Sequence, residues 1–87
     1  MQEPTTGWAL LLSDHDHRRR TVEEKIAAIR RLHLPSAKIV EVIGPLQQVF
    51  GRQGYHLILK LEAGSEDGML EAFEALENSF SHVDGFI

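Results

Sequence analysis

The chain has 87 residues, of which 43% are hydrophobic and 25% are charged, and it contains no cysteine. This length allows one hydrophobic core and this composition excludes a disordered chain, so we expect a single domain over residues 1–87. The absence of cysteine excludes a disulfide framework and a cysteine nucleophile. The net charge of −4 opposes a nucleic-acid partner, because binding to nucleic acid requires Lys and Arg to neutralise phosphates.

The chain has no apolar stretch of the roughly 18 residues that a membrane-spanning helix needs, and its N-terminus does not resemble a secretory signal. We therefore expect a cytoplasmic protein with no membrane partner. Its charges are unevenly placed, with seven bases from Arg18 to Lys38 and seven acids but no base after Lys60. Either a basic helix packs beside an acidic one, or the surface is polarised toward a charged partner.

The first elements in chain order are a strand and a helix. The apolar run from Gly7 to Ser13 is too short for a helix and predicts a central strand. Thr21 and Glu24 have the spacing of a capping box, so we expect a helix over residues 22–32, which Pro35 terminates.

The middle of the chain predicts a β-hairpin. β-Branched residues favour a strand over residues 37–43, and Gly44-Pro45 either ends this strand or kinks it, with residues 46–50 as an extension beyond the kink. Residues 51–54 predict the turn. The next strand, over residues 55–62, alternates clearly, with Tyr55, Leu57, Leu59 and Leu61 on one side and His56, Ile58, Lys60 and Glu62 on the other.

The last elements are a helix and a short strand. Ser65 is the expected N-cap, and Met69, Phe73, Leu76 and Phe80 form one apolar stripe at helical spacing. Residues 82–87 predict a terminal strand.

The order βαββαβ predicts an α+β fold, a ferredoxin-like sandwich in which a four-stranded antiparallel sheet carries two helices on one face. The other face of the sheet is then open. We expect Leu11, Ile58 and Phe86 to point to this open face. An apolar open face is usually covered by a second subunit, a peptide or a ligand, so we expect these residues to bind a partner.

Two polar segments are candidate sites. In Asp14-His15-Asp16-His17, the side chains of His15, Asp16 and His17 are of the type that binds zinc or nickel, although the segment also reads as a solvated loop. Arg18, Arg19 and Arg20 precede the first helix, where they either hold an anion or form a solvated face.

Neither RNA binding nor catalysis is favoured. Residues 53–59 occupy the place of the signature strand of an RNA-recognition motif, but only Tyr55 among them is aromatic. Ser13, Asp14, His15 and His17 are neighbours in sequence, whereas a catalytic triad converges from separate elements. We therefore expect neither an enzyme nor a cofactor.

The segment 54–87 resembles the C-terminal half of ferredoxin-like regulatory modules. Its Gly-Tyr start, its aliphatic strand and its helix are similar to those of ACT domains and of the ligand-response domains of the leucine-responsive regulator family. Val83-Asp84-Gly85 also resembles the turn before the last strand in the small chaperone of periplasmic nitrate reductase. The first resemblance implies dimerisation and ligand sensing at a dimer interface, and the second implies peptide binding on the open face.

The sequence therefore predicts a regulatory or protein-interaction domain, a homodimer or the binder of a protein or peptide. Two alternatives remain open at this point, namely a His-rich metal-responsive domain and an accessory chaperone of a larger enzyme.

Overall fold

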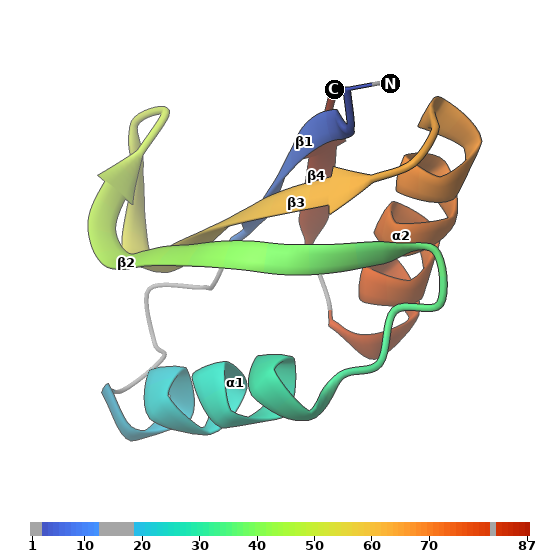
Figure 1. Ribbon diagram of the computed structural model, residues 1–87. Coiled ribbons are helices and arrows are strands. Elements are labelled where there is room, and N and C mark those ends of the chain that lie inside the picture. The colour runs from blue at the N-terminus through green and yellow to red at the C-terminus, as the bar shows by residue number, and fades with distance from the viewer. Residues whose placement is uncertain (1–2, 13–18, 81) are drawn as a thin grey trace.

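The computed structural model describes residues 3–12, 19–80 and 82–87. Within them it has four strands and two helices, in the predicted order βαββαβ (Figure 1). The elements are β1 (Thr5–Leu11), α1 (Arg19–Arg31), β2 (Ala37–Val49), β3 (Arg52–Ala63), α2 (Glu66–Ser79) and β4 (Val83–Phe86). The prediction of an α+β fold is confirmed.

The four strands form one antiparallel sheet in the order β2-β3-β1-β4. This order is compatible with the ferredoxin-like arrangement expected from the sequence. The register between β1 and β3 sets Leu10 opposite Ile58 and Leu11 opposite Leu57. Because neighbouring strand residues point to opposite faces, this register also fixes which side chains share a face of the sheet.

The hydrophobic core lies between one face of the sheet and the two helices. The predicted stripe of β3 is confirmed, since Leu57, Leu59 and Leu61 are fully buried in this core and Tyr55 packs against it. Each helix adds apolar side chains to the same cluster, and these are Ile29 from α1 and Met69, Ala72, Phe73 and Leu76 from α2. The sheet face that carries these leucines is therefore the covered face.

Small residues allow close packing against α2. Gly7 lies where a Cβ atom would stand 2.5 Å from the Sδ atom of Met69, and Gly85 lies where a Cβ atom would stand 2.6 Å from the ring of Phe73. The predicted N-cap of α2 is confirmed, because the Ser65 hydroxyl accepts a hydrogen bond of 3.1 Å from the backbone N–H of Gly68. The glycines of β1 and β4 thus allow α2 to pack closely against these strands, and the N-cap stabilises the first turn of the helix.

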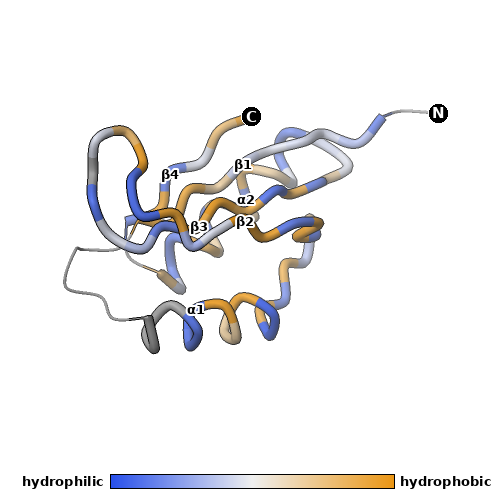
Figure 2. Tube along the Cα trace, turned by 90° about the vertical axis from the view of Figure 1, so that its left-hand side faces the viewer, coloured by the Kyte–Doolittle hydropathy of each residue, from blue (hydrophilic) through white to orange (hydrophobic). Residues whose placement is uncertain are grey.

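The β2–β3 hairpin is longer than the rest of the sheet. β2 continues through Gly44-Pro45, so of the two predicted alternatives the kink is correct, and the register with β3 shifts on both sides of Leu46. Such irregularities bend a strand and increase its twist. The end of the hairpin accordingly rises on the side of the sheet opposite α1 (Figures 1 and 2).

The turn of the hairpin differs from the predicted one. Val49 pairs with Arg52, so the connection is the two residues Phe50 and Gly51 and not residues 51–54. Both have positive φ, of 51° and 77°, as a type I′ turn requires. A phenylalanine in this left-handed region is strained by roughly 1–3 kcal/mol.

No helix among the described residues has the length and apolar content needed to cross a membrane.

Candidate functional site: the open face of the sheet

The face of the sheet turned away from the helices carries an apolar hollow. Its volume is about 250 Å³. The seven residues that line it come from all four strands and from the hairpin turn, and every one is apolar: Trp8, Leu10, Ile43, Val49, Phe50, Ile58 and Phe86. We call this set the apolar hollow and the sheet face around it the open face.

Cross-strand pairing builds the floor of the apolar hollow. Trp8 of β1 lies between Phe86 of β4 and Lys60 of β3 in the register of the sheet. In the next row, Leu10 of β1 lies opposite Ile58 of β3, which in turn lies opposite Ile43 of β2. Two adjacent rows therefore bring apolar side chains from separate strands together.

The raised hairpin adds a wall to this floor. Val49, at the end of β2, and Phe50, in the turn, belong to the lining although they lie six and seven residues after Ile43 in the chain. In Figure 2 the tip of the hairpin includes a hydrophobic segment between hydrophilic ones and lies on the opposite side of the sheet from α1. The bend of β2 thus places the turn beside the open face and not at the end of a flat ribbon.

Several aromatic side chains on this face remain in contact with water. Phe50 is 85% exposed, Phe86 51% and Trp8 38%. With about 200 Å² for each aromatic residue, these fractions correspond to roughly 350 Å² of exposed surface from three residues. That value is already of the size of the largest apolar patch on a typical monomer, which is about 300–600 Å² and often functional.

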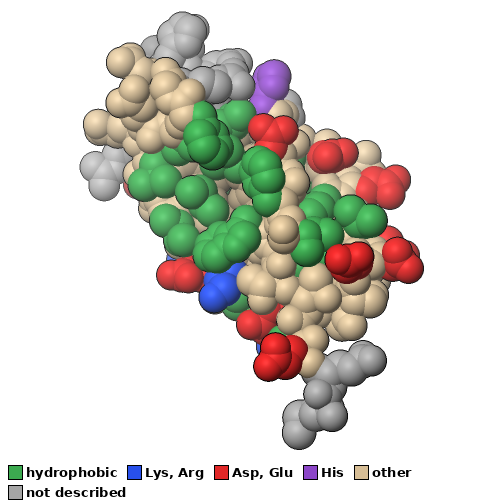
Figure 3. Space-filling model, turned by 90° about the horizontal axis from the view of Figure 1, so that it is seen from above, with side chains coloured by type: hydrophobic (Ala, Val, Ile, Leu, Met, Phe, Trp, Pro, Cys, Tyr) green, Lys and Arg blue, Asp and Glu red, His purple; other side chains and the backbone are tan. Residues whose placement is uncertain are grey.

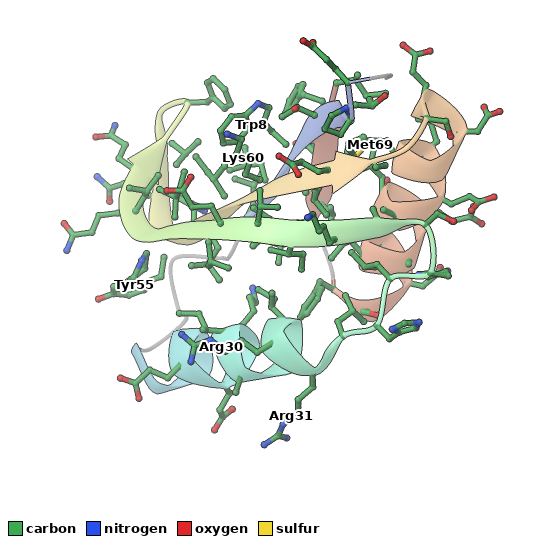
Figure 4. All side chains as sticks on the ribbon, in the orientation of Figure 1. Trp8, Arg30, Arg31, Tyr55, Lys60 and Met69 are labelled. Carbon is green, nitrogen blue, oxygen red and sulfur yellow. The ribbon has the colours of Figure 1, made fainter. Side chains whose placement is uncertain are left out.

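Charged residues lie beside the apolar hollow on the same face (Figure 3). The Nζ atom of Lys60 lies 5.6 Å from the centroid of the Trp8 ring, a cation–π contact, and both side chains lie on the side of the sheet opposite α1 (Figure 4). Lys38 lies 3.9 Å from Glu62 across β2 and β3, and Glu41 is paired with Lys60 in the register. Asp84 of β4 lies opposite Leu10 in the register and therefore points to the same face. The polar part of the open face carries two lysines and three acids, and these are Lys38, Lys60, Glu41, Glu62 and Asp84.

The structure corrects one of the three predicted partner-binding residues. Leu11 is fully buried in the core against the helices, so its assignment to the open face was wrong. Ile58 and Phe86 do line the apolar hollow, and their role in partner binding stays a prediction. Leu10, the neighbour of Leu11, lines the apolar hollow where Leu11 was expected.

A signal for the correct face was present in the sequence. Gly7 and Ala9 are small and alternate with the large Trp8 and Leu10. Small residues suit the face against which a helix packs closely, so the large ones belong to the other face. The prediction missed this because a run of Leu10, Leu11 and Leu12 carries no polar residue that marks a side.

The predicted metal and anion residues are not tested by the structure. His15, Asp16, His17 and Arg18 lie outside the described residues, and Arg19 and Arg20 begin α1 with side chains that are not described. Within the described part of the chain, no group of three or more His, Cys, Asp or Glu side chains is arranged to hold a metal ion. The metal-responsive and anion-binding hypotheses stay predictions.

No protein-family model, no curated protein and no solved structure matches the chain. The open face is therefore the feature of the described residues that bears on function.

Proposed function

We propose that this protein is a non-catalytic interaction domain of ferredoxin-like fold that binds another polypeptide through its open face. The observation that carries this proposal is the apolar hollow, in which seven apolar residues stay uncovered by either helix. Burial of apolar surface contributes about 25 cal/mol per Å², so covering the three exposed aromatic residues alone favours association by several kcal/mol before the cost of binding.

A polypeptide suits this surface better than a small molecule does. Ligand pockets usually have about 300–1,000 Å³ and a few polar groups that fix the orientation of the ligand. The apolar hollow has about 250 Å³ and only apolar lining residues. By contrast, an apolar centre with charged residues beside it is the usual composition of a protein–protein interface.

The test uses a photoreactive amino acid at two positions of the full chain in its native cell. With p-benzoylphenylalanine in place of Trp8, we expect covalent adducts to a polypeptide after irradiation, because the proposed partner covers this position. The matched control places the same amino acid at Leu70, which is 54% exposed on α2, the helix that packs on the opposite face. Adducts in equal yield at both positions, or none at position 8, would contradict the proposal.

A further inference from the structure

We infer that the polypeptide segment that covers the open face is cationic, and that it places a Lys or Arg side chain against Asp84 while its apolar side chains fill the apolar hollow. This inference rests on the proposed function and states the chemistry of its partner. It follows from the position of Asp84 in the sheet and from the way in which the other charges of the open face are paired.

Asp84 stands at the edge of the apolar hollow. It belongs to β4, an edge strand of the sheet, and its side chain is exposed. In the register it lies opposite Leu10, which lines the hollow. The same row continues with Ile58 and Ile43, which also line the hollow. Phe86, two residues further along β4, points to the same face. Asp84 is thus the polar end of a row that is otherwise apolar.

The other four charges of the open face compensate each other in pairs. The Nζ atom of Lys38 lies 3.9 Å from the carboxylate of Glu62, and Lys60 lies opposite Glu41 in the register. The carboxylate of Asp84, by contrast, forms no ion pair and no hydrogen bond with any residue in the described part of the chain. Among the charges that the described residues bring to this face, Asp84 is therefore the one that lacks a counter-charge.

A segment that fills the apolar hollow also comes close to Asp84. Removing a carboxylate from water is costly unless a cation or a hydrogen-bond donor takes the place of the water. A Lys or Arg side chain offsets this cost, whereas an acidic segment adds repulsion and an entirely apolar one leaves the carboxylate without a partner. A second copy of this chain is disfavoured on the same ground, because it brings a further Asp84 and a further net charge of −4.

The wider surface favours a cationic partner as well. Figure 3 shows acidic side chains on several sides of the hydrophobic surface of this face. Together with the net charge of the chain, they attract a cationic segment and repel an acidic one during approach.

The experiment is fluorescence anisotropy with the purified full chain and two labelled synthetic peptides. Both peptides have the same central run of Leu and Phe, which is flanked by lysines in one and by glutamines in the other. At low salt we expect the lysine peptide to bind at least about 5-fold more tightly than the glutamine peptide, and we expect this preference to shrink as NaCl screens the charges. Equal affinity for the two peptides, or no binding of the lysine peptide, would overturn the inference.

Two variants locate the attraction. Asp84→Asn removes the charge and keeps the shape of the side chain, so the dissociation constant of the lysine peptide should rise about 3–5-fold and that of the glutamine peptide should stay unchanged. The matched control is Glu74→Gln, which makes the same change in net charge at an exposed position of α2, on the other side of the sheet. It should leave both dissociation constants unchanged. Equal weakening by the two variants would show that the net charge of the chain and not Asp84 attracts the peptide. Circular dichroism checks that both variants keep the fold.

Photocrosslinking at position 8 separates this inference from the proposed function. If the crosslinked segment of the partner carries acidic residues and no Lys or Arg, the inference fails and the proposed function stands. If no adduct forms at position 8, both fail.

Discussion

At the scale of single residues, Gly85 allows β4 to lie close to α2. A Cβ atom at this position would be 2.6 Å from the Cγ and Cδ2 atoms of Phe73, whose ring is largely buried. We expect Gly85→Ala to lower the free energy of unfolding by about 1–3 kcal/mol, because a well-packed core resists added volume. Urea denaturation followed by circular dichroism measures this change.

Gly64→Ala is the matched control for this substitution. No heavy atom lies within 4 Å of a Cβ atom built at Gly64. The same chemical change should therefore alter the free energy of unfolding by no more than about 0.5 kcal/mol. Equal effects at both glycines would show that the loss at Gly85 does not come from contact with Phe73.

The residues of the open face also show what a sequence does and does not reveal at this scale. Ile58 was placed correctly because β3 alternates polar and apolar residues, which marks its two sides. Leu11 was placed wrongly because β1 is apolar on both sides. Val49 and Phe50 were missed as lining residues, because only the bend of β2 brings the turn over the open face.

At the scale of elements, the N-cap of α2 gives a second stability prediction. The Ser65 hydroxyl accepts a hydrogen bond from the N–H of Gly68, which otherwise has no partner within the helix. We expect Ser65→Ala to lower the free energy of unfolding by about 1 kcal/mol and Ser65→Asn to change it little, because asparagine is an equally good N-cap residue. Thermal unfolding of the two variants beside the wild type provides the comparison. An alanine variant as stable as the asparagine variant would show that the cap contributes nothing.

The bounds of the elements were predicted with uneven success. The helix α2 was anticipated well, since a cap and an apolar stripe at helical spacing both mark it. The sequence predicts the hairpin turn too late, at residues 51–54, because its glycines favour a turn there, whereas the chain turns at Phe50 and Gly51. A phenylalanine at positive φ goes against that local preference. Of the register shifts in β2, the sequence marks the one at Gly44-Pro45 but not those at Ile39/Glu41 and Leu46/Gln48.

Gly44 offers a second prediction at this scale. Its φ is +123°, and a Cβ atom there would lie 2.7 Å from the carbonyl oxygen of His56. We expect Gly44→Ala to lower the free energy of unfolding by at least about 1 kcal/mol and to disturb the bend that carries Val49 and Phe50 to the apolar hollow. Amide chemical shifts along β2 and β3 would report the disturbance. Shifts that change only at Gly44 and its sequence neighbours would contradict this account of the bend.

At the scale of the whole molecule, the order of elements and the α+β class followed from periodicity, capping residues and turn residues, because each element carried its own local signal. The shape of the open face did not follow in the same way. The sequence pattern predicts that the two helices leave one face of the sheet uncovered. The depth and composition of that face depend on how four strands and a turn are arranged in space. The apolar hollow is therefore a tertiary feature.

The chain has a single tryptophan, and Trp8 stands on the open face, so its fluorescence reports directly on whether this face is covered. The measurement is acrylamide quenching of Trp8 in the chain alone and in a mixture with the polypeptide crosslinked at position 8, whose own tryptophans are replaced by phenylalanine. The account predicts that in the mixture quenching weakens and the emission shifts to shorter wavelength, because the bound polypeptide shields the open face from water. Quenching and emission that are equal in the two samples, although the two polypeptides bind each other, would show that the partner contacts another surface and would contradict the account.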